Sequence, residues 1–425
     1  MNAVERAVAD AHRGEWAAVL AATVRVTRDL DTAEEAVQEA YVQALRTWRR
    51  DGVPDRPGAW LTTVSRRTAL NLVRRRRTLD AKLPLLVTPA AVGAEGREVV
   101  DGDSDGGGPD PEAIPDDRLR LMFTCCHPAL SPEAQVALTL RLVCGVATPD
   151  IARAFIVAEA TMAARLTRAK KKIAAARIPY AVPPAAELPA RVDAVLTVVH
   201  LLYSTGHTAP SGGDLVRAEL CGRALGLAGL VRRLLPDDRE AMGLQALLLV
   251  HEARRDTRTD AAGRLLRLED QDRSRWDRAQ IAEADRLVVA ALRAGPPGRF
   301  TLQAAIASLH ARAPSYEATD WPQILTLYGE LAQVWPSPVV ALNRAVALGM
   351  VDGPGAALAE VDALERDGRL AGYHYLAATR ADLLHRLDRD TEAAAAYREA
   401  LAGCDNEAER AFLRERLRRV TGSRR

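Results

Sequence analysis

The sequence predicts an all-α protein, and three observations lead to this prediction. Apolar residues make up 48% of the 425 residues and are mostly Ala, Leu and Val, a composition that favours helices. Aromatic residues make up only 4%, which together with few Ile residues argues against an all-β fold. Residues 190–425 show helical patterns throughout and no signal of a β-strand or β-hairpin. At about 150 residues per domain, the length suggests two to four domains.

The near-neutral total charge conceals a strong segregation. Lys and Arg number 58 against 56 Asp and Glu, a net charge of +2. Residues 1–80 carry a charge of +3, residues 90–117 carry −8, residues 118–180 carry +7, and residues 181–425 carry −1. Two basic segments therefore flank an acidic one, and a neutral half follows. This distribution suggests that nucleic-acid contact is confined to the first 180 residues.

Residues 1–80 are expected to form one helical domain. Asp31 is a plausible N-cap, with Glu34 three residues later as in a capping box. Apolar residues then recur at steps of three and four, which predicts a buried stripe of Ala33, Val37, Ala40, Tyr41, Ala44, Leu45 and Trp48. Opposite this stripe lies an acidic face made of Asp31, Glu34, Glu35, Gln38 and Glu39. That face is either simply solvated or a docking site for a basic partner.

A second helix is expected to begin near Ala59 and to run into four consecutive arginines at 74–77. One of its faces interleaves cationic and polar residues, namely Thr63, Arg67, Asn71 and Arg74. Such a face, with Trp60 nearby, suits contact with unstacked bases. Core packing is the alternative for Trp60, and a general polyanion-attracting surface is the alternative for the arginines.

Residues 81–115 are expected to be a flexible acidic linker, because they are rich in Gly and Pro and could bury little apolar surface. The sequence of residues 116–180 predicts a domain of short helices. Ser131 and Thr148 are expected to cap two of them, each with Pro at the following position. A helix that starts at Thr148, a break near Ile156 and a longer helix over 159–175 form a helix-turn-helix pattern.

The helix over 159–175 has two distinct faces. Its apolar stripe is predicted to consist of Met162, Leu166, Ala169 and Ile173, and its polar row of Thr161, Arg165, Arg168 and Lys172. Arginine can pair bidentately with guanine in the major groove, whereas Lys171 and Lys172 suit phosphate contacts. The alternative is a solvated basic face.

Residues 190–425 contain a faint repeat. Ala345, Ala357 and Val361 are spaced as Ala381, Ala393 and Tyr397 are, at an offset of 36 residues. Small residues where two helices cross, followed four positions later by a large apolar residue, are typical of tetratricopeptide-like hairpins.

No pattern in the sequence predicts an enzyme, a metal site or a cofactor. Cys125, Cys126 and His127 lack the spacing of a zinc site, so we expect buried thiols there. His251-Glu252 begins like a zinc-protease helix, but Arg255 stands where the second His is required. The charged residues around Trp276 are interpreted as a structural cluster of salt bridges and caps; they are Asp270, Asp272, Arg273 and Asp277.

Several motifs resemble one known family. DTAEEAVQEAY at 31–41 and PGAWLTTVSRR at 57–67 resemble region 2 of the extracytoplasmic-function sigma factors of bacterial RNA polymerase, in the sigma-70 family. Residues 130–133 together with 145–172 resemble their region 4. LEDQDRSRWD at 268–277, AAIASLHA at 304–311 and PSPVVALNRA at 336–345 resemble the subgroup with a long tetratricopeptide-like C-terminal extension.

The resemblance implies a role for each face. The acidic face (Asp31, Glu34, Glu35, Gln38 and Glu39) would bind the clamp helices of the polymerase β′ subunit, and region 4 would contact the β flap. The −10 element would be bound by Trp60, Thr63, Arg66, Arg67, Asn71, Arg74 and Arg75, and the −35 element by Thr161, Arg165, Arg168, Lys171 and Lys172. Ile156 stands where the turn often has Gly, and Ala163 and Ala164 replace polar residues common in the reading helix. Base reading would then use fewer side chains or DNA shape.

The resulting hypothesis is a promoter-specificity factor for RNA polymerase. The helical extension over 190–425 would regulate it through a regulatory protein or through intramolecular contact, in place of a separate anti-sigma factor. The alternatives are a helix-turn-helix regulator and a helical-repeat adaptor that binds nucleic acid nonspecifically. With five cysteines, no apolar leader over 1–16 and no membrane span, we expect a cytoplasmic protein with no membrane partner.

Overall fold

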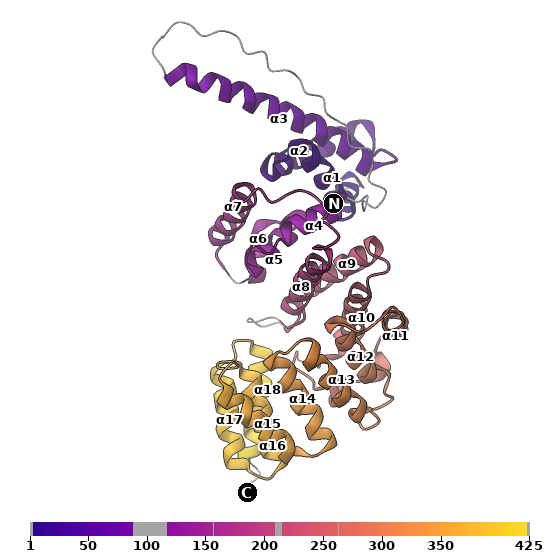
Figure 1. The fold of residues 1–425 in the computed structure, drawn as a ribbon, viewed down its shortest axis with the longest axis vertical. Coiled ribbons are helices and arrows are strands. Elements are labelled where there is room, and N and C mark those ends of the chain that lie inside the picture. The colour runs from indigo at the N-terminus through magenta and orange to yellow at the C-terminus, as the bar shows by residue number, and fades with distance from the viewer. Residues whose placement is uncertain (1–2, 88–116, 156, 209–214, 262, 423–425) are drawn as a thin grey trace. The chain divides into compact units, whose positions relative to one another are not determined.

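The computed structural model describes residues 3–87, 117–155, 157–208, 215–261 and 263–422 (Figure 1). The chain divides into two compact units, Met1–Val198 and Val199–Arg425, and the boundary falls within one helix. Within the described residues there is no β-strand, only an isolated bridge between Thr259 and Leu265. The all-α prediction is confirmed. None of the described helices is long and apolar enough to cross a membrane.

Three long helices begin the first unit: α1 (Ala3–Thr27), α2 (Leu30–Asp51) and α3 (Pro57–Val87). The predicted stripe of α2 is buried except for Leu45, which is partly exposed. The predicted cap is wrong by two residues. Asp29, not Asp31, caps α2 by accepting a hydrogen bond from the Thr32 backbone N–H at 2.7 Å. The helix begins earlier because Leu30 is buried and extends its apolar face.

Shorter helices complete the first unit. They are α4 (Asp117–Cys125), α5 (Pro132–Leu138), the π-helical turn η1 (Thr139–Val143), α6 (Thr148–Phe155) and α7 (Glu159–Ala175). The predicted Ser131 cap is confirmed, since its hydroxyl accepts from the Ala134 N–H. Helix α7 has the predicted bounds, and all four residues of its apolar stripe are buried. Ile156, in the turn before α7, lies outside the described residues.

Helix α8 (Leu188–His207) spans the boundary between the units. The second unit continues with α9 (Ala218–Leu234), α10 (Arg239–Ala253), α11 (Arg278–Arg293) and α12 (Arg299–Arg312). Three short 3₁₀ turns lie between α10 and α11: η2 (Arg255–Thr257), η3 (Leu268–Asp270) and η4 (Arg273–Arg275).

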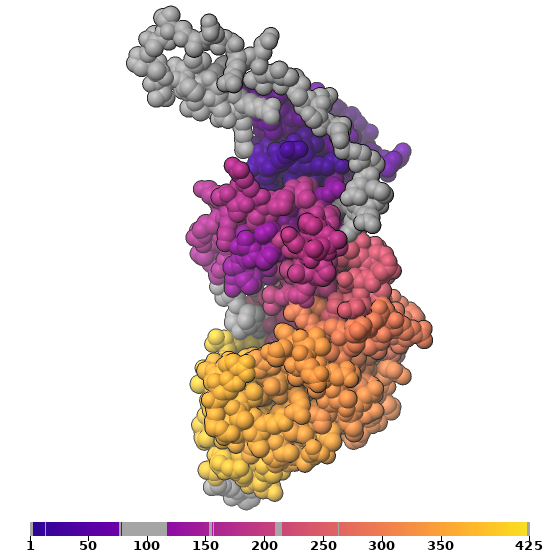
Figure 2. All heavy atoms as spheres, in the orientation of Figure 1, coloured from indigo at the N-terminus to yellow at the C-terminus, as the bar shows by residue number. Residues whose placement is uncertain are grey.

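Successive antiparallel helices form the rest of the second unit, the orange and yellow part of Figures 1 and 2. They are α13 (Trp321–Val334), α14 (Pro338–Val351), α15 (Pro354–Asp367), α16 (His374–Arg386), α17 (Asp390–Ala402) and α18 (Glu407–Gly422). The predicted repeat corresponds to the hairpins α14–α15 and α16–α17. All six residues that define it are buried in one core, with exposed fractions of 0–2%. Small residues allow α14 and α15 to cross closely. A Cβ added to Gly349 of α14 would lie only 3.0 Å from the Cβ of Ala357 in α15, which is tighter than ordinary van der Waals contact.

Candidate nucleic-acid interface

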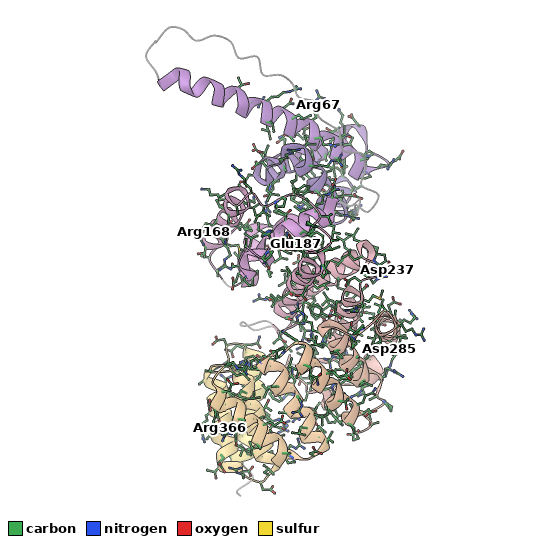
Figure 3. The ribbon with its side chains drawn as sticks, viewed as in Figure 1. Arg67, Arg168, Glu187, Asp237, Asp285 and Arg366 are labelled. Carbon is green, nitrogen blue, oxygen red and sulfur yellow. The ribbon has the colours of Figure 1, made fainter. Side chains whose placement is uncertain are left out.

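One face of α3 presents the predicted polar and cationic row to solvent. Thr63, Arg67, Asn71 and Arg74 are all exposed, as is Arg75, whereas Arg66 is partly buried. Figure 3 labels Arg67 on this helix. Among the residues that the structure describes, Arg67, Arg74 and Arg75 have no ion-pair partner. Unpaired guanidinium groups in a row at helical spacing suit a nucleic-acid backbone or unstacked bases.

Trp60, at the start of the same helix, is partly buried rather than open. Its ring lies edge-on to Trp48 of α2 with ring centroids 5.6 Å apart. Trp48 itself is 1% exposed. The structure therefore places Trp60 at the rim of the core, where one side of its ring packs and the remainder reaches solvent.

Helix α7 separates its two rows as the sequence predicts. Thr161, Arg168, Lys171 and Lys172 are exposed on the side away from the buried stripe (Figure 3 labels Arg168). Arg165 is partly buried, and its guanidinium lies 5.9 Å from the centroid of the Phe155 ring in α6. This contact with α6 restricts the reach of Arg165 in comparison with that of the exposed Arg168.

The acidic face of α2 is not uniform. Asp31, Glu35, Gln38 and Glu39 are exposed, but Glu34 is only 6% exposed. Lys170 of α7 donates to Glu34 Oε2 and to Asp31 Oδ1, both at 2.7 Å. Arg141 of η1 forms an ion pair with Glu34 Oε1, and the Gln38 side chain donates to the same oxygen at 3.2 Å. The partner of Glu34 is thus the chain's own helix-turn-helix domain.

The electrostatics of this contact agree with its geometry. Burial alone would lower the pKa of Lys170, but the carboxylates of Glu34 and Asp31 outweigh it and raise that pKa above its ordinary value. The side chain of Lys170 is 13% exposed and that of Glu34 8% exposed, so the pair is shielded from solvent. Such a pair is costly to break by removing one partner, because the other charge stays buried.

Contacts of α1 support the same arrangement. The Trp16 indole N–H donates to the Leu142 carbonyl at 3.0 Å, and the Tyr180 hydroxyl donates to the Ala21 carbonyl at 2.9 Å. Gly145, in the turn after η1, has a φ of +67°, and a Cβ there would lie 2.9 Å from the rings of both His12 and Trp16. Position 145 therefore requires glycine for two reasons, which are its left-handed backbone conformation and the close approach of α1.

The charged residues around Trp276 and the cysteine pair at 125–126 have structural roles. Asp272 caps η4, and Asp277 caps α11 by accepting from two backbone N–H groups. Arg273 donates to the His310 and Ala313 carbonyls and lies over the Trp276 ring at 4.6 Å. The prediction of a structural cluster is confirmed for these residues. Cys125 and Cys126 are buried free thiols, also as expected.

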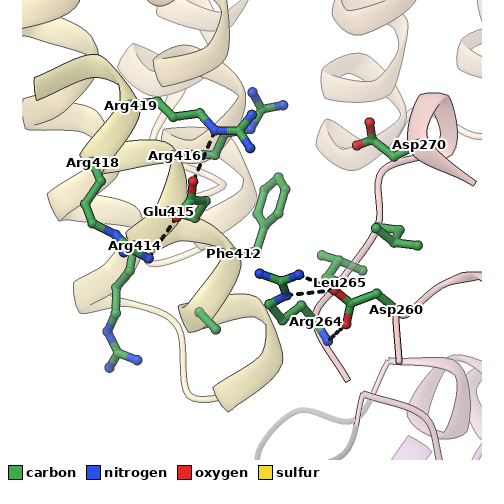
Figure 4. A pocket seen from close by; sticks show the side chains of 12 residues that line it. Asp260, Arg264, Leu265, Asp270, Phe412, Arg414, Glu415, Arg416, Arg418 and Arg419 are labelled. Atoms are coloured by element: carbon green, nitrogen blue, oxygen red, sulfur yellow. Dashed lines mark hydrogen bonds and ion pairs between the residues drawn. The ribbon is translucent and has the colours of Figure 1, made fainter. Parts of the chain in front are cut away.

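A pocket of about 480 Å³ in the second unit lies between α18 and the segment that leads to η3 (Figure 4). Arginines dominate its wall, but many of the charges already pair with one another. Arg264 binds Asp260 at 2.7 Å, and Glu415 binds Arg418 at 2.8 Å and Arg419 at 3.3 Å. The pocket wall is therefore a charged surface, and its residues do not form the combination of acid, base and nucleophile that is typical of an active site.

Comparison with known proteins identifies the two domains of the first unit. Residues 17–78 match the family "Sigma-70 region 2", and residues 120–173 match "Sigma-70, region 4". The chain belongs to the sigma-70 family. It is similar to the extracytoplasmic-function type of sigma-70 factor and carries a C-terminal extension. Residues 191–292 of that extension match a family of unknown function, DUF6596.

The chain is also 44% identical over 400 residues to the uncharacterized protein R00370 of Rhizobium meliloti (strain 1021), which covers 94% of this chain and 92% of that protein. No solved structure matches significantly. Sigma-70 factors are transcription initiation factors rather than enzymes, and their domains imply core RNA polymerase and promoter DNA as partners.

Sequence reasoning missed the pairing of Glu34 with Lys170 and Arg141. Lys170 lies 136 residues after Glu34 in the sequence. Each of these residues resembles an ordinary surface charge when only the sequence is considered. A usable signal was present, however. Lys170 lies four residues after Leu166 and three before Ile173, so helical geometry places it at the border of the buried stripe.

Proposed function

We propose that this sigma-70 factor binds core RNA polymerase through the acidic face of α2 and directs it to promoters with two elements. In this mechanism α3 holds the melted −10 element and α7 reads the −35 element. The observation that carries the proposal is the pair of exposed cationic rows on α3 and α7, in the two domains that match sigma-70 regions 2 and 4.

The individual roles follow from exposure and chemistry. Arg168 and Thr161 are exposed and suit base edges in the major groove, while Lys171 and Lys172 suit phosphates. Arg165, which lies beside the Phe155 ring, suits a base contact in the second turn of the reading helix. On α3, the row from Thr63 through Arg67, Asn71 and Arg74 suits the single strand that melting produces. Arg66, Arg75 and Trp60 border that row.

The docking face is proposed to exist in two forms. In the arrangement described here, Lys170 and Arg141 occupy Glu34, so the centre of the acidic face is closed to a partner. Asp31, Glu35, Gln38 and Glu39 remain exposed around it. We infer that α7 and η1 leave Glu34 before polymerase binds the whole face. The extension would influence that step, either directly or through another protein.

The decisive experiment adds the full-length chain to sigma-free core polymerase with a genomic promoter library and maps the transcript starts. The proposal expects specific starts that share two sequence elements. Because the closed form could silence the wild-type chain, the Arg141→Ala/Lys170→Ala double variant is assayed beside it. Absence of specific initiation from both chains would contradict the proposal and favour a regulator or adaptor.

A second pair of variants separates the docking face from the DNA-reading helix. Glu35→Lys is expected to weaken binding to core polymerase and to leave binding to isolated promoter DNA unchanged. Arg165→Ala is expected to cost about 1–3 kcal/mol at one position of the −35 element if it contacts a base. A uniform loss across sequences would assign Arg165 to phosphate instead. Unchanged polymerase affinity of Glu35→Lys would remove the proposed docking face.

A further inference from the structure

Three side chains in the second unit bring metal-ligand atoms together where α16 begins and α17 meets α18. His374 is the first residue of α16, Cys404 lies in the turn after α17, and Glu409 lies in the first turn of α18. Their ligand atoms all lie within 4.8 Å of one another. No spacing in the sequence indicates this site, because the three residues are separated by 30 positions and then by five.

The two distances from Glu409 Oε2 match those between ligands of a tetrahedral ion, and His374 Nε2 and Cys404 Sγ lie within 4.8 Å of each other. His374 Nε2 lies 3.5 Å from Glu409 Oε2, and Cys404 Sγ lies 3.8 Å from the same oxygen. Ligands that each sit about 2.0–2.3 Å from a tetrahedral zinc ion are about 3.3–3.8 Å from one another. Glu409 Oε2 is therefore placed so that one ion could contact it together with the imidazole and the sulfur.

Two polar atoms at the site are poorly used by the protein alone. His374 Nε2 is buried and has no hydrogen bond of good geometry to any described residue. The Cys404 thiol, which is fully buried, makes only long contacts, 3.7 Å to the Asn406 carbonyl and 3.8 Å to Glu409. Buried polar atoms without good partners call for an explanation, and an ion is one.

The surrounding residues hold the ligands in place as the outer shell of a metal site does. The Tyr375 hydroxyl donates to Glu409 Oε1, which leaves Oε2 directed toward the histidine and the cysteine. Asn406 accepts from the backbone N–H of Glu409 at 3.2 Å and fixes the start of α18. Arg410 donates to the Cys404 carbonyl at 2.6 Å and to the Leu401 carbonyl at 2.8 Å, which fixes the cysteine turn. Ligand carboxylates are commonly oriented by such hydrogen bonds.

We propose that His374, Cys404 and Glu409 bind one Zn²⁺ ion, with a water molecule as the fourth ligand. The set of thiolate, imidazole and carboxylate favours zinc over magnesium or calcium, which prefer oxygen ligands alone. Three protein ligands leave one position for solvent. The His374 side chain is 17% exposed although its Nε2 is buried, so the site lies just beneath the surface. The ion would join the start of α16 to the α17–α18 turn and stabilise the last two hairpin layers.

Cobalt substitution tests the proposal directly. The full-length chain, reduced and freed of metal by a chelator, is titrated with Co²⁺ and followed by absorption spectroscopy. The expected result is one Co²⁺ per chain, with the visible bands of a tetrahedral ion and a thiolate-to-cobalt charge-transfer band that Zn²⁺ displaces. No charge-transfer band, or more than one equivalent with no preferred site, would overturn the proposal.

Matched variants locate the site. Cys404→Ser is expected to abolish the charge-transfer band, whereas Cys221→Ser, which removes another buried thiol of the same unit, should retain it. Tyr375→Phe keeps all three ligands and is expected to weaken Zn²⁺ binding about 10- to 100-fold. It keeps the proposal testable if Cys404→Ser fails to fold. A band that survives Cys404→Ser, or unchanged affinity in Tyr375→Phe, would contradict the assignment.

A thermal-unfolding measurement separates an ion that binds the folded site from one that binds nonspecifically. Zn²⁺ should raise the unfolding midpoint of the wild-type chain, because a ligand of the native state stabilises it. The Glu409→Gln and His374→Asn variants should show a smaller rise at the same ion concentration. Equal rises in all three proteins would contradict the proposed ligands.

Discussion

Arginine is used in opposite ways in the two units of this protein. On α3 and α7 of the first unit, Arg67, Arg74 and Arg168 stand exposed without an ion-pair partner among the described residues. In the second unit, many arginines are bound internally. Arg344 pairs with Glu360 at 2.6 Å, and Arg380 pairs with Asp362 at 2.8 Å. Others, such as Arg273 and Arg410, donate to backbone carbonyls.

This difference explains the charge segregation of the sequence in physical terms. The exposed cationic rows of α3 and α7 are available to an external polyanion, whereas Lys170 and Arg141 of the same unit are held by the carboxylates of α2. The arginines of the second unit hold turns and helix ends together, so their charge is largely balanced within the fold. The same residue type thus indicates a binding surface in one unit and structural support in the other.

The largest expected effect concerns a structural arginine. Arg273→Ala removes the donor of two backbone carbonyls, at 2.7 and 2.8 Å, and the group that covers the Trp276 ring. We expect a loss of about 3 kcal/mol in the free energy of unfolding, because buried acceptors lose their partner. Urea unfolding of the full chain measures it. A loss below about 0.5 kcal/mol would remove the structural role assigned to Arg273.

A surface arginine of the first unit should show the reverse behaviour. Arg168→Ala is expected to leave the free energy of unfolding nearly unchanged and to weaken promoter binding by about 1–3 kcal/mol. Salt titration of DNA affinity shows whether a phosphate contact was also lost. Arg286→Ala, an exposed arginine of the second unit paired with Glu283, is the matched control and should bind DNA as the wild type does. Equal losses in both variants would contradict the proposed reading face.

Removing Lys170 tests the contact that joins the two sigma domains. Lys170→Ala leaves Glu34 with Arg141 and Gln38 alone, and we expect a loss of about 1–3 kcal/mol in stability. The same variant should bind core polymerase more tightly than the wild type, because Glu34 becomes more accessible. Lys171→Ala, on the exposed side of α7, is the control for both measurements. If polymerase affinity falls instead, Lys170 contributes to docking rather than opposing it.

A smaller effect on the free energy of unfolding is expected when the pH is lowered. Burial, together with the positive charges of Arg254 and Arg273, lowers the pKa of His310 to about 4, whereas an unfolded histidine titrates near 6.5. Between these values the unfolded chain binds the additional proton, so stability falls as the pH decreases from about 6.5 to about 4. His310→Phe should make the stability of the chain less dependent on pH in this window. An unchanged dependence would mean that His310 is readily protonated in the folded state.

Much of the fold was predictable because it depends on local periodicity. The bounds of α7 and the six residues of the hairpin repeat followed from apolar spacing alone, which reports directly which face of a helix is buried. The cap of α2 was predicted wrongly, since the capping-box spacing to Glu34 pointed to Asp31 while Asp29, two residues earlier, caps the helix. The burial of Leu30 decides between them, and it depends on tertiary packing.

The candidate interface was predictable only in part. Exposed rows such as Arg67 and Asn71 follow from helical geometry, so the sequence suffices to find them. The burial of Glu34 by Lys170 and Arg141 depends on how two domains pack, and no local pattern encodes it. The cluster of His374, Cys404 and Glu409 was missed for the same reason, because its members meet only after three helices have packed.

The position of Lys170 beside Arg168 and Lys171 on α7 has a thermodynamic consequence in the proposed mechanism. One helix then carries both the group that closes the docking face and the groups that read DNA. Promoter DNA that draws α7 away from α2 would raise the affinity for polymerase, and polymerase bound at Glu34 would raise the affinity for DNA. Linkage requires these two effects to be equal in free energy. Cooperative promoter recognition would thus depend on Lys170, which binds two carboxylates and shares Glu34 with Arg141.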